Sequence, residues 1–464
     1  MTQHHPELQV VILAAGEGTR MRSSRPKVLH PVLGRPMLEY VLHAVENLKP
    51  MNIAVVIGHG AARVREQIGK PRGLKWVEQA EQLGTAHAVL QCEKVGKTAQ
   101  DVLIVCGDTP RLKSETLASL IEAHQSSGSA VSLLSAKLDD PHGYGRVLRG
   151  DDGSCLGIVE EKDASAEQRG IREINSGIYC VKREVLFDLL HQIENDNAQG
   201  EYYLPDMLPL ALKEGLKVQV LPVDDVSEIS GINDRAQLAE VEAVMQSQII
   251  RDWQMKGVTI EHPETVRIEA TVRIGMDTVI QAGCYLIGST KIGDECRVGP
   301  YAVLVDAWLD DQVDVFAFTH IHGANVGSNT DVGPFARLRP GAEIDEEARI
   351  GNFVEVKKSV IGRGSKVNHL TYIGDTVMGE NCNIGAGTIT CNYDGANKHQ
   401  TRIGDNVFVG SDTKLIAPVE VNDNATIGAG GIISKDVKAG GLTLSARPEQ
   451  RHVSNWQRPS KKSD

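Results

Sequence analysis

The chain has 464 residues, which is too long for one ordinary hydrophobic core, so its length predicts two domains that each bury an interior. Charged residues make up 24% of the sequence and apolar residues 41%, which excludes a disordered or fibrous protein. The net charge of -12 argues against a general binder of nucleic acid or of anionic membranes, so any phosphate site must be local.

The cysteines and the N-terminal region indicate the compartment. The eight cysteines are scattered and include no C-x-x-C pair, which predicts reduced thiols rather than disulfides or a zinc site. The N-terminal residues lack a basic stretch followed by an apolar core, and no apolar run is long enough to cross a bilayer. We therefore expect a cytoplasmic protein without membrane insertion.

Short β-branched runs alternate with longer amphipathic stretches through about residue 225, as at 10–13, 53–57 and 102–105. This alternation is typical of βαβ units and predicts a mostly parallel sheet. Ligands of such sheets lie beyond the carboxyl ends of the strands. The segments to inspect are therefore 14–21, 58–60 and 107–108.

The first of these segments has the composition of a phosphate-binding loop. The sequence L-A-A-G-E-G-T-R-M spans residues 13–21 and is followed by Pro26 and Lys27. Small residues let backbone N–H groups approach phosphate oxygens, while Arg20 and Lys27 supply positive charge for a polyphosphate. Met21 stands where a dinucleotide fingerprint has its third glycine, so a nicotinamide site is disfavoured. The alternative is a plain glycine-rich turn with surface basic residues.

Asp108 ends another predicted strand. An aspartate before Thr109 and Pro110 can simply cap a turn. Beside a phosphate loop it is better interpreted as a magnesium ligand, because Mg²⁺ keeps several waters and substrate oxygens and needs few protein ligands.

A single long helix is predicted from 234 to 254, where Leu238, Val241, Met245, Ile249 and Trp253 recur at helical spacing.

After this helix the apolar period changes to six. Many of these apolar residues are followed by glycine, which permits tight corners, and the pattern is the hexapeptide repeat of a parallel β-helix. The three registers consist of Ile268, Ile274, Ile280, Leu286, Ile292, Val298 and Leu304; of Val326, Val332, Leu338, Ile344, Ile350 and Val356; and of Ile403, Val409, Leu415, Val421, Ile427 and Ile433.

The repeat is interrupted between the second and third registers. Met378 and Ile384 come one residue early, and 391–401 is an insertion, so function is expected in this region. Arg339 and Lys357 are eighteen residues apart, one coil of three six-residue sides, so they would stack and clamp a phosphate. Alternatively they are two solvated charges.

Several motifs together resemble one enzyme family. G-x-G-T-R-M followed by P-K resembles the signature of sugar-1-phosphate nucleotidylyltransferases, and 79–86, 106–108, 143–146, 175–177 and 197–203 look like the uridylyltransferase branch. The segments N-x-I-G-A-G-T-I-T-C-N-Y-D-G and V-F-V-G-S-D-T match an acetyltransferase nearly letter for letter. The chain thus resembles the bacterial bifunctional N-acetylglucosamine-1-phosphate uridylyltransferase and glucosamine-1-phosphate N-acetyltransferase.

The resemblance implies a fold and a pathway step. It implies a Rossmann-like α/β nucleotidyltransferase domain (1–232), a linker helix (233–256), a left-handed parallel β-helix acetyltransferase domain (257–450) and a basic tail (451–464). Acetyl-CoA would acetylate glucosamine 1-phosphate, and UTP would then uridylylate N-acetylglucosamine 1-phosphate and release pyrophosphate. The product, UDP-N-acetylglucosamine, serves cell-envelope polymers. Family members of this type are homotrimers with acetyl-transfer sites between subunits.

The resemblance also assigns residues of the uridylyltransferase half. Arg20 and Lys27 would be catalytic, and Asp108 and Asn233 would hold Mg²⁺. The residues implied to bind UTP or the UDP-sugar are Leu13, Ala14, Ala15, Gly16, Lys27, Gln79, Gly84, Thr85, Cys106, Gly107, Asp108, Gly145, Glu160, Asn175 and Asn233, with Gln79, Gly84 and Thr85 at the uracil and Gly145, Glu160 and Asn175 at the sugar.

In the acetyltransferase half, His369 would be the general base that deprotonates the 2-amino group of the sugar. The sugar phosphate would bind Arg339, Lys357, Tyr372 and Asn383. Acetyl-CoA would bind Ala386, Asn392, Tyr393, Ser411, Ala429 and Arg447, the last displaced by one position from the family pattern.

Three other functions compete with this one. The β-helix could merely regulate a single-function nucleotidyltransferase, although His369 and Asn392-Tyr393 speak against that. A metal-dependent β-helix enzyme could use His320, His322 and His369. A catalytically dead scaffold would have an eroded phosphate loop, whereas here the loop is complete.

Overall fold

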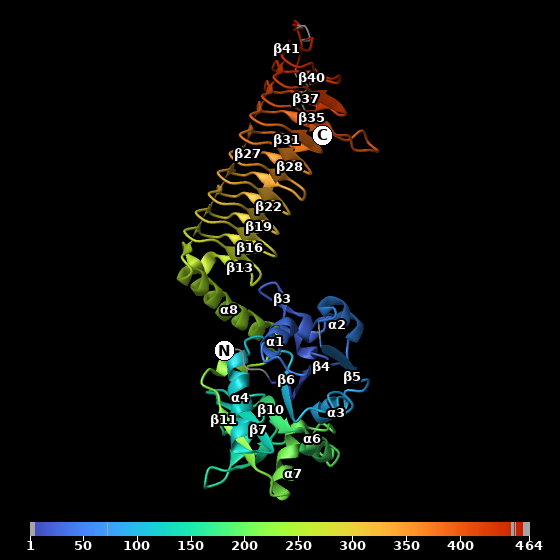
Figure 1. The fold of residues 1–464 in the computed structure, drawn as a ribbon, viewed down its shortest axis with the longest axis vertical. Coiled ribbons are helices and arrows are strands. Elements are labelled where there is room, and N and C mark those ends of the chain that lie inside the picture. Colours follow the sequence, from blue (N-terminus) through green and yellow to red (C-terminus); the bar gives the residue numbers. More distant parts are fainter. Residues whose placement is uncertain (1–4, 72, 447–449, 451, 458–464) are drawn as a thin grey trace. The chain divides into compact units, whose positions relative to one another are not determined.

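A computed structural model describes residues 5–71, 73–446, 450 and 452–457. The chain divides into two compact units, Met1–Met245 and Gln246–Asp464. In the described residues no helix has both the length and the apolar character needed to cross a membrane. Figure 1 shows the helices and the central sheet of the first unit and the stacked coils of the second.

The first unit is built on a sheet of strand order β11-β7-β10-β6-β1-β4-β5, onto which β8 and β9 pair beside β10. Its pairs are parallel except at β10, which runs antiparallel to β6, β7 and β8, and at the β8–β9 hairpin. The strands are β1 Leu8–Ala14, β4 Asn52–Ile57, β5 Leu74–Glu78, β6 Asp101–Cys106, β7 Val131–Lys137, β8 Arg146–Arg149, β9 Cys155–Val159, β10 Glu173–Lys182 and β11 Val218–Pro222.

Helices cover this sheet, and the two apolar clusters of the unit lie on its two sides. The helices are α1 Met37–Glu46, α2 Ala61–Ile68, α3 Thr85–Leu90, α4 Ser114–Ser127, α5 Ala166–Arg169, α6 Arg183–Leu190 and α7 Met207–Lys213. A small hairpin pairs β2 Pro31–Val32 with β3 Arg35–Pro36, and 3₁₀ helices of this unit lie at Thr19–Met21, Lys27–Leu29, Leu204–Asp206 and Val226–Glu228, while another, Pro263–Thr265, lies in the second unit. The mostly parallel sheet predicted from the sequence is confirmed.

The predicted long helix is α8, Arg235–Met255, and the division between the units falls within it. Its last turns belong to the second unit, where Ile250 is buried and Ile249 and Trp253 pack against the β-helix core.

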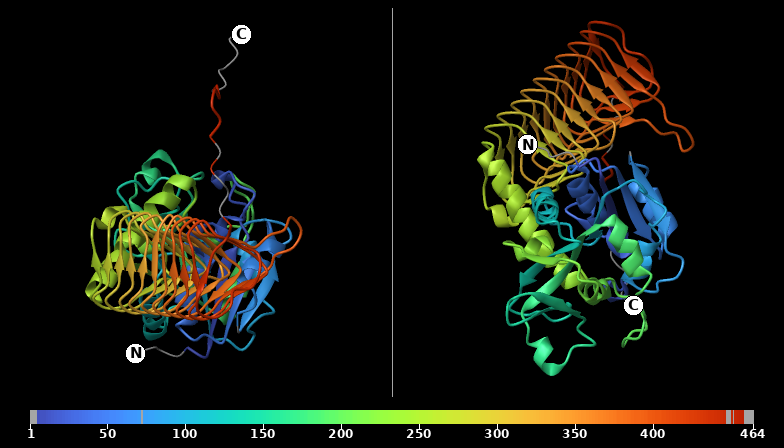
Figure 2. Two further views of the ribbon diagram at one scale, coloured as in Figure 1. Left: turned by 90° about the horizontal axis from the view of Figure 1, so that it is seen from above. Right: turned by 60° about the horizontal axis from the view of Figure 1, so that its bottom comes forward.

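The second unit is a parallel β-helix whose coils pass through three sheets (Figure 1; the coils are seen along another direction in Figure 2). Sheet 1 contains β12 Thr259–Ile260, β15 Val279–Ile280, β18 Arg297–Val298, β21 Asp314–Val315, β24 Asp331–Val332, β27 Arg349–Asn352, β30 Lys366–His369, β33 Asn383–Ile384, β36 Phe408–Val409, β39 Thr426–Ile427 and β41 Leu442–Thr443. Sheet 2 contains β13 Arg267–Ile268, β16 Tyr285–Ile287, β19 Val303–Val305, β22 His320–His322, β25 Arg337–Leu338, β28 Glu355–Lys357, β31 Tyr372–Gly374, β34 Ile389–Cys391, β37 Lys414–Ile416 and β40 Ile432–Ile433. Sheet 3 contains β14 Arg273–Ile274, β17 Lys291–Ile292, β20 Trp308–Leu309, β23 Asn325–Val326, β26 Glu343–Ile344, β29 Val360–Ile361, β32 Thr376–Met378, β35 Thr401–Ile403 and β38 Val419–Val421.

The period of six is confirmed, because every residue of the three predicted registers is buried in one continuous core. The insertion is confirmed as well: Thr376 pairs with Thr401, twenty-five positions on, whereas the coils before it, from Arg267 onward, close after seventeen or eighteen. The one-residue slip before Met378 is less informative than expected. Lys291 pairs with Trp308 and Trp308 with Asn325, seventeen positions apart each time, so shortened coils also occur away from the predicted site.

Leu338→Ala should destabilise the β-helix by about 2–5 kcal/mol, because Leu338 is fully buried and its removal leaves a cavity between coils. The measurement is a urea titration of the full chain followed by circular dichroism. The matched control is Arg337→Ala, the preceding residue, whose side chain is 56% exposed. Equal shifts of the two variants would contradict the predicted inward position of Leu338.

Two candidate active sites

A cavity of about 520 Å³ in the first unit is lined by ten of the residues predicted to bind the nucleotide. They follow β1, β5 and β6, whose carboxyl ends lie at one edge because β1 pairs with β4 and β6, and β4 pairs with β5. The ten are Leu13, Ala14, Ala15, Gly16, Lys27, Gln79, Gly84, Thr85, Cys106 and Asp108.

Glycine is required in the loop after β1. Gly18 has a φ of 63°, and a Cβ there would lie 2.6 Å from Cβ of Lys27. The close approach brings the lysine against the loop, so that its ammonium reaches the cavity together with the backbone of residues 13–19.

Oxygens of two residues distant in sequence converge on this ammonium. Lys27 Nζ forms an ion pair with Asp108 Oδ2 and donates a hydrogen bond to Asn233 Oδ1 at 2.9 Å. Arg20 donates to the same Asn233 oxygen at 2.8 Å. One carboxylate and one amide oxygen therefore face a single cation, which is the donor set that Mg²⁺ accepts when substrate oxygens and waters complete its shell. The two residues fit the predicted magnesium site.

The predicted sugar residues form a neighbouring group. Asn175 N donates to Gly145 O at 2.8 Å, and a Cβ on Gly145 would lie 2.9 Å from Glu160 Oε1, so these three residues are in contact. Burial and the nearby Asp206 and Asp163 raise the pKa of the Glu160 carboxyl. Tyr179 donates from its buried hydroxyl to Asn175 Oδ1 at 2.9 Å, which leaves the Asn175 amide nitrogen for a ligand.

Cys106 lines the cavity but is not suited to nucleophilic attack. Burial, with a smaller contribution from Asp108, raises the pKa of its thiol to about 12. The thiol lies against Gly177, since a Cβ on that glycine would be 3.0 Å from its sulfur. Cys106 is therefore an uncharged residue in the wall of the cavity, and it lies between the cavity and the residues predicted to bind the sugar. Gly107 separates it from Asp108 in the sequence.

Some cavity residues were not predicted as ligands. Gln82 and Glu201 line the cavity, and Tyr202, which follows Glu201, pairs its backbone with Leu83 and Ala86 beside Gly84 and Thr85. Glu201 belongs to the segment 197–203, which resembles the uridylyltransferase branch, but no role was predicted for this residue.

In the second unit His369 begins a column of small side chains that follows the axis of the β-helix. His369 pairs with Asn352 one coil earlier, and register places Ala386, Ser411 and Ala429 at corresponding positions in later coils. The backbone bonds of their neighbours agree, with Asp412 N donating to Ala386 O at 2.7 Å and Gly430 N to Ser411 O at 2.8 Å. Three residues predicted to bind acetyl-CoA thus form one narrow track above His369.

Asn352 is the partner of His369 that the sequence did not reveal. Nδ1 of the exposed His369 lies 2.9 Å from Asn352 Oδ1. When Nδ1 carries the proton and donates it to that oxygen, Nε2 is left as an unprotonated acceptor. This is the form of histidine that a general base requires.

Arg339 and Lys357 lie in adjacent coils, as predicted, since Arg339 N donates to Val356 O at 2.9 Å. Arg339 also donates to Glu355 Oε1 at 2.8 Å. A third cation, Lys398 from the inserted segment, was missed. It contacts Lys357 and lowers the pKa of that ammonium, and Arg339 acts in the same direction. Three cations in one cluster favour the approach of an anion, although Glu355 pairs with Arg339 and Asp375 lies near Lys357.

The inserted segment is a hairpin that places Lys398 there. Tyr393 and Lys398 form an isolated antiparallel β-bridge. Asp394 Oδ1 accepts hydrogen bonds from the backbone N–H groups of Ala396 and Asn397 at 2.8 and 2.7 Å. His399 Nε2 lies 2.7 Å from Asp394 Oδ2. Two neighbouring side chains are also placed: Asn392 is buried and donates to Asp375, while Tyr393 is 60% exposed.

The cation cluster and His369 are not brought together within one chain. His369 ends a strand of sheet 1, whereas Lys357 ends a strand of sheet 2, so a full side of the coil separates them. The Tyr372 hydroxyl lies over Gly374, at the cluster's end of sheet 2, and Asn383 pairs with Lys366 in sheet 1. Arg447 lies outside the described residues.

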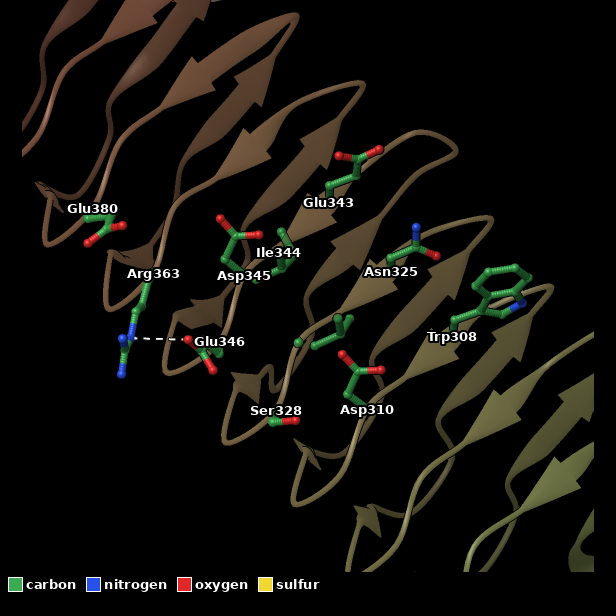
Figure 3. Close-up of a pocket in the computed structure, with 12 residues that line it drawn as sticks. Trp308, Asp310, Asn325, Ser328, Glu343, Ile344, Asp345, Glu346, Arg363 and Glu380 are labelled. Atoms are coloured by element: carbon green, nitrogen blue, oxygen red, sulfur yellow. Dashed lines mark ion pairs between the residues drawn. The ribbon is translucent and has the colours of Figure 1, made fainter.

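A groove on sheet 3 is mainly acidic, unlike the cation cluster on sheet 2 (Figure 3). It is lined by acidic side chains with Arg363, which pairs with Glu346 at 3.4 Å. Among the described residues no group of three His, Cys, Asp or Glu side chains is arranged to hold a metal ion. His320 and His322 lie on sheet 2 and His369 on sheet 1, so the histidines considered for a metal-dependent enzyme do not converge.

Two family models match the chain. The model of the MobA-like NTP transferase domain matches residues 10–175, which include every residue that lines the cavity except Glu201. The model of the bacterial transferase hexapeptide (six repeats) matches residues 271–306 and 400–435 of the β-helix.

Relatives match over nearly the whole length. The chain is 46% identical to the bifunctional protein GlmU of Marinobacter nauticus over 454 residues, covering 98% of this chain and 99% of that one. It is 47% identical to the GlmU proteins of Chromobacterium violaceum and Burkholderia vietnamiensis, again covering 98% of this chain and 99% and 100% of those. The chain belongs to the GlmU family.

Membership decides between the competing functions. This GlmU-family chain is a bifunctional transferase that combines a nucleotidyltransferase with a hexapeptide-repeat acetyltransferase, and its small-molecule substrates include a nucleotide and acetyl-CoA. A β-helix that only regulates, and a catalytically dead scaffold, are both contradicted.

Lys398→Ala should weaken binding of glucosamine 1-phosphate at neutral pH about tenfold, because one of three cations facing the phosphate is lost. The pH dependence of this binding in the alkaline range should also change. Lys398 lowers the pKa of Lys357, so its removal lets Lys357 keep its proton to higher pH, and the loss of binding on raising pH begins later in the variant. Calorimetry across the alkaline range measures both effects.

The control is Arg349→Ala, which removes an exposed cation paired with Asp331. Unchanged affinity in Lys398→Ala would show that Lys398 does not belong to the site.

Proposed function

We propose that each unit carries one step of UDP-N-acetylglucosamine synthesis, with the residues assigned above. The second unit transfers acetyl from acetyl-CoA to glucosamine 1-phosphate, and the first transfers uridylyl from UTP to the product. The observation that supports this division most directly is the presence of two separate clusters, one cation–oxygen cluster around Lys27 and one column above His369. We retain 1–232, 233–256 and 257–450 as the functional boundaries, with 451–464 as a tail.

In uridylyl transfer, an oxygen of the sugar 1-phosphate attacks the α-phosphorus of UTP. The bond from that phosphorus to the bridging oxygen breaks, and pyrophosphate leaves. Arg20 and Lys27 face the position where negative charge increases, and the backbone of residues 13–16 holds phosphate oxygens. No protein nucleophile is needed, since positioning and charge stabilisation account for most of the rate in phosphoryl-type transfers.

Asp108 and Asn233 would hold Mg²⁺, which when bound neutralises phosphate charge and orients the leaving pyrophosphate. Lys27, which contacts both oxygens in this structure, would then turn its ammonium toward the substrate phosphates. Gln79, Gly84 and Thr85 would bind uracil, and Gly145, Glu160 and Asn175 would bind the N-acetylated sugar.

In acetyl transfer, His369 Nε2 accepts a proton from the 2-amino group while the nitrogen bonds to the acetyl carbon. The carbon–sulfur bond breaks and CoA leaves as a thiolate that is then protonated. Asn352 keeps the His369 ring oriented. The extended pantetheine arm of acetyl-CoA fits the track of Ala386, Ser411 and Ala429, where small side chains permit close approach, with Asn392, Tyr393 and Arg447 as further contacts.

We also propose a homotrimer with the acetyl site between subunits. The separation of His369 from Arg339, Lys357 and Tyr372 within one chain supports this, because a neighbouring copy can then supply the missing half. Since UTP and acetyl-CoA are cytoplasmic metabolites, we expect the enzyme to act in the cytoplasm.

Asp108→Ala and Lys27→Ala should each lose most uridylyl transfer, because each removes a charge that faces the reacting phosphates. Acetyl transfer should stay nearly intact in both, since its residues lie in the other unit. The measurement is pyrophosphate release and CoA thiol release from the same preparation. A folded variant that loses both activities equally would contradict the division of labour.

His369→Ala should reduce acetyl transfer about 10²–10⁴-fold, the usual contribution of general-base catalysis. Pyrophosphate release from UTP and N-acetylglucosamine 1-phosphate should remain at the wild-type rate. Asn352→Ala should reduce acetyl transfer less, because the base is kept but its orientation is not. A near-normal thiol-release rate in His369→Ala would remove the proposed role.

A further inference from the structure

We propose that His87 fixes the orientation of the Gln79 amide and thereby makes the nucleotide cavity select uracil over cytosine. This inference rests on the proposed function, since it concerns the base of the nucleotide that the first unit uses. His87 lies in α3 and is not among the cavity-lining residues, so it acts through Gln79 as a positioning residue.

The contacts of Gln79 determine which amide atom lies where. Gln79 is 3% exposed, and its Nε2 lies 3.1 Å from Gly84 O and 3.0 Å from His87 Nδ1. A carbonyl oxygen only accepts hydrogen bonds, so the atom beside Gly84 O must be the amide nitrogen. Its second hydrogen then points to His87 Nδ1, which must be unprotonated to accept it.

The carbonyl of Gly84 cannot move away to permit the opposite orientation. Gly84 has a φ of 116°, and a Cβ there would lie 2.4 Å from Tyr202 O. Tyr202 is bonded on both sides of the glycine, with its N donating to Leu83 O at 2.8 Å and its O accepting from Ala86 N at 2.9 Å. A third hydrogen bond holds the same segments together, because the Thr85 hydroxyl accepts from Leu204 N at 2.9 Å. The acceptor that orients Gln79 is therefore fixed by the fold.

The contact of the second ring nitrogen of His87 is the one that changes. Its Nε2 lies 3.1 Å from Gln91 Nε2, and that amide nitrogen also lies 3.1 Å from the His87 carbonyl of its own helix. A neutral imidazole cannot accept at both nitrogens, so one amide must turn. Gln91 is half-buried at the end of α3, so its side chain can rotate away from the His87 carbonyl, which would repel the amide oxygen, while that oxygen accepts the Nε2 proton.

The arrangement leaves one polar atom of Gln79 for the ligand. Among the described residues no hydrogen bond uses Gln79 Oε1, although the side chain lines the cavity. An amide oxygen accepts the N3–H that uracil carries between its two carbonyls. Cytosine presents an unprotonated N3 at the same place, so two lone pairs would face each other. A site whose buried group is left unpaired rejects such an analogue strongly.

The test compares His87→Phe, which keeps the ring volume and loses the acceptor, with His87→Asn, whose amide oxygen can replace Nδ1. Gln91→Leu controls for loosening of α3. For each variant and the wild type, kcat/KM is measured with UTP and with CTP, and urea unfolding of the same sample followed by circular dichroism reports that the first unit is folded.

In His87→Phe the ratio of kcat/KM for UTP to that for CTP should fall about tenfold, mainly through a higher KM for UTP, as expected for loss of one orienting hydrogen bond. His87→Asn and Gln91→Leu should stay within about threefold of the wild-type ratio. An unchanged ratio in an active His87→Phe enzyme, or an equal fall in Gln91→Leu, would overturn the inference. If the wild-type chain releases no pyrophosphate from UTP, the proposed function itself is wrong.

Discussion

Parallel pairing of strands is the constraint on which both candidate sites depend. It brings residues that follow different strands to the same edge or the same column, whatever their distance in sequence. In the first unit it places the segments after β1, β5 and β6 around one cavity. In the second unit it repeats every coil, so that Asn352, His369 and Ala386 occupy one line although seventeen residues separate each from the next.

The two sites use this constraint differently. The proposed nucleotide cavity lies within one unit and contains fixed charges: Lys27 forms an ion pair with Asp108, and Lys27 and Arg20 both donate to Asn233 Oδ1. The proposed acetyl-transfer site is a column of residues that runs along the β-helix. The proposed base and the cation cluster lie at the two ends of one side of a coil, which makes the assembly of several copies part of the proposed mechanism.

Much of this follows from the sequence because some patterns are local. A period of six identifies the core residues of a β-helix directly, since each coil side contributes one inward side chain, and all nineteen predicted residues are buried. The segment after β1 was predicted to be a phosphate loop because small residues and Lys27 stand close together in it, and the structure places this segment in the wall of the cavity. Asp108 gained its interpretation only from being near that loop.

The rest depended on contacts between distant segments, which spacing does not encode. Lys398 meets Lys357 because an inserted hairpin folds back over the coil, and the insertion signals a loop without showing where its tip lies. Asn352 supports His369 because coils of seventeen residues interrupt a strict count of eighteen. For the same reason the slip before Met378 could not distinguish a functional region from the shortened coils at Trp308 and Asn325.

The central claim is that one polypeptide performs two successive transfers at two pockets. The most direct measurement supplies purified chain with glucosamine 1-phosphate, UTP, Mg²⁺ and acetyl-CoA labelled in its acetyl group, and follows the label by chromatography. The account predicts labelled UDP-N-acetylglucosamine, with one CoA thiol and one pyrophosphate formed for each molecule. Label that stops at N-acetylglucosamine 1-phosphate, or that never leaves acetyl-CoA, would contradict it.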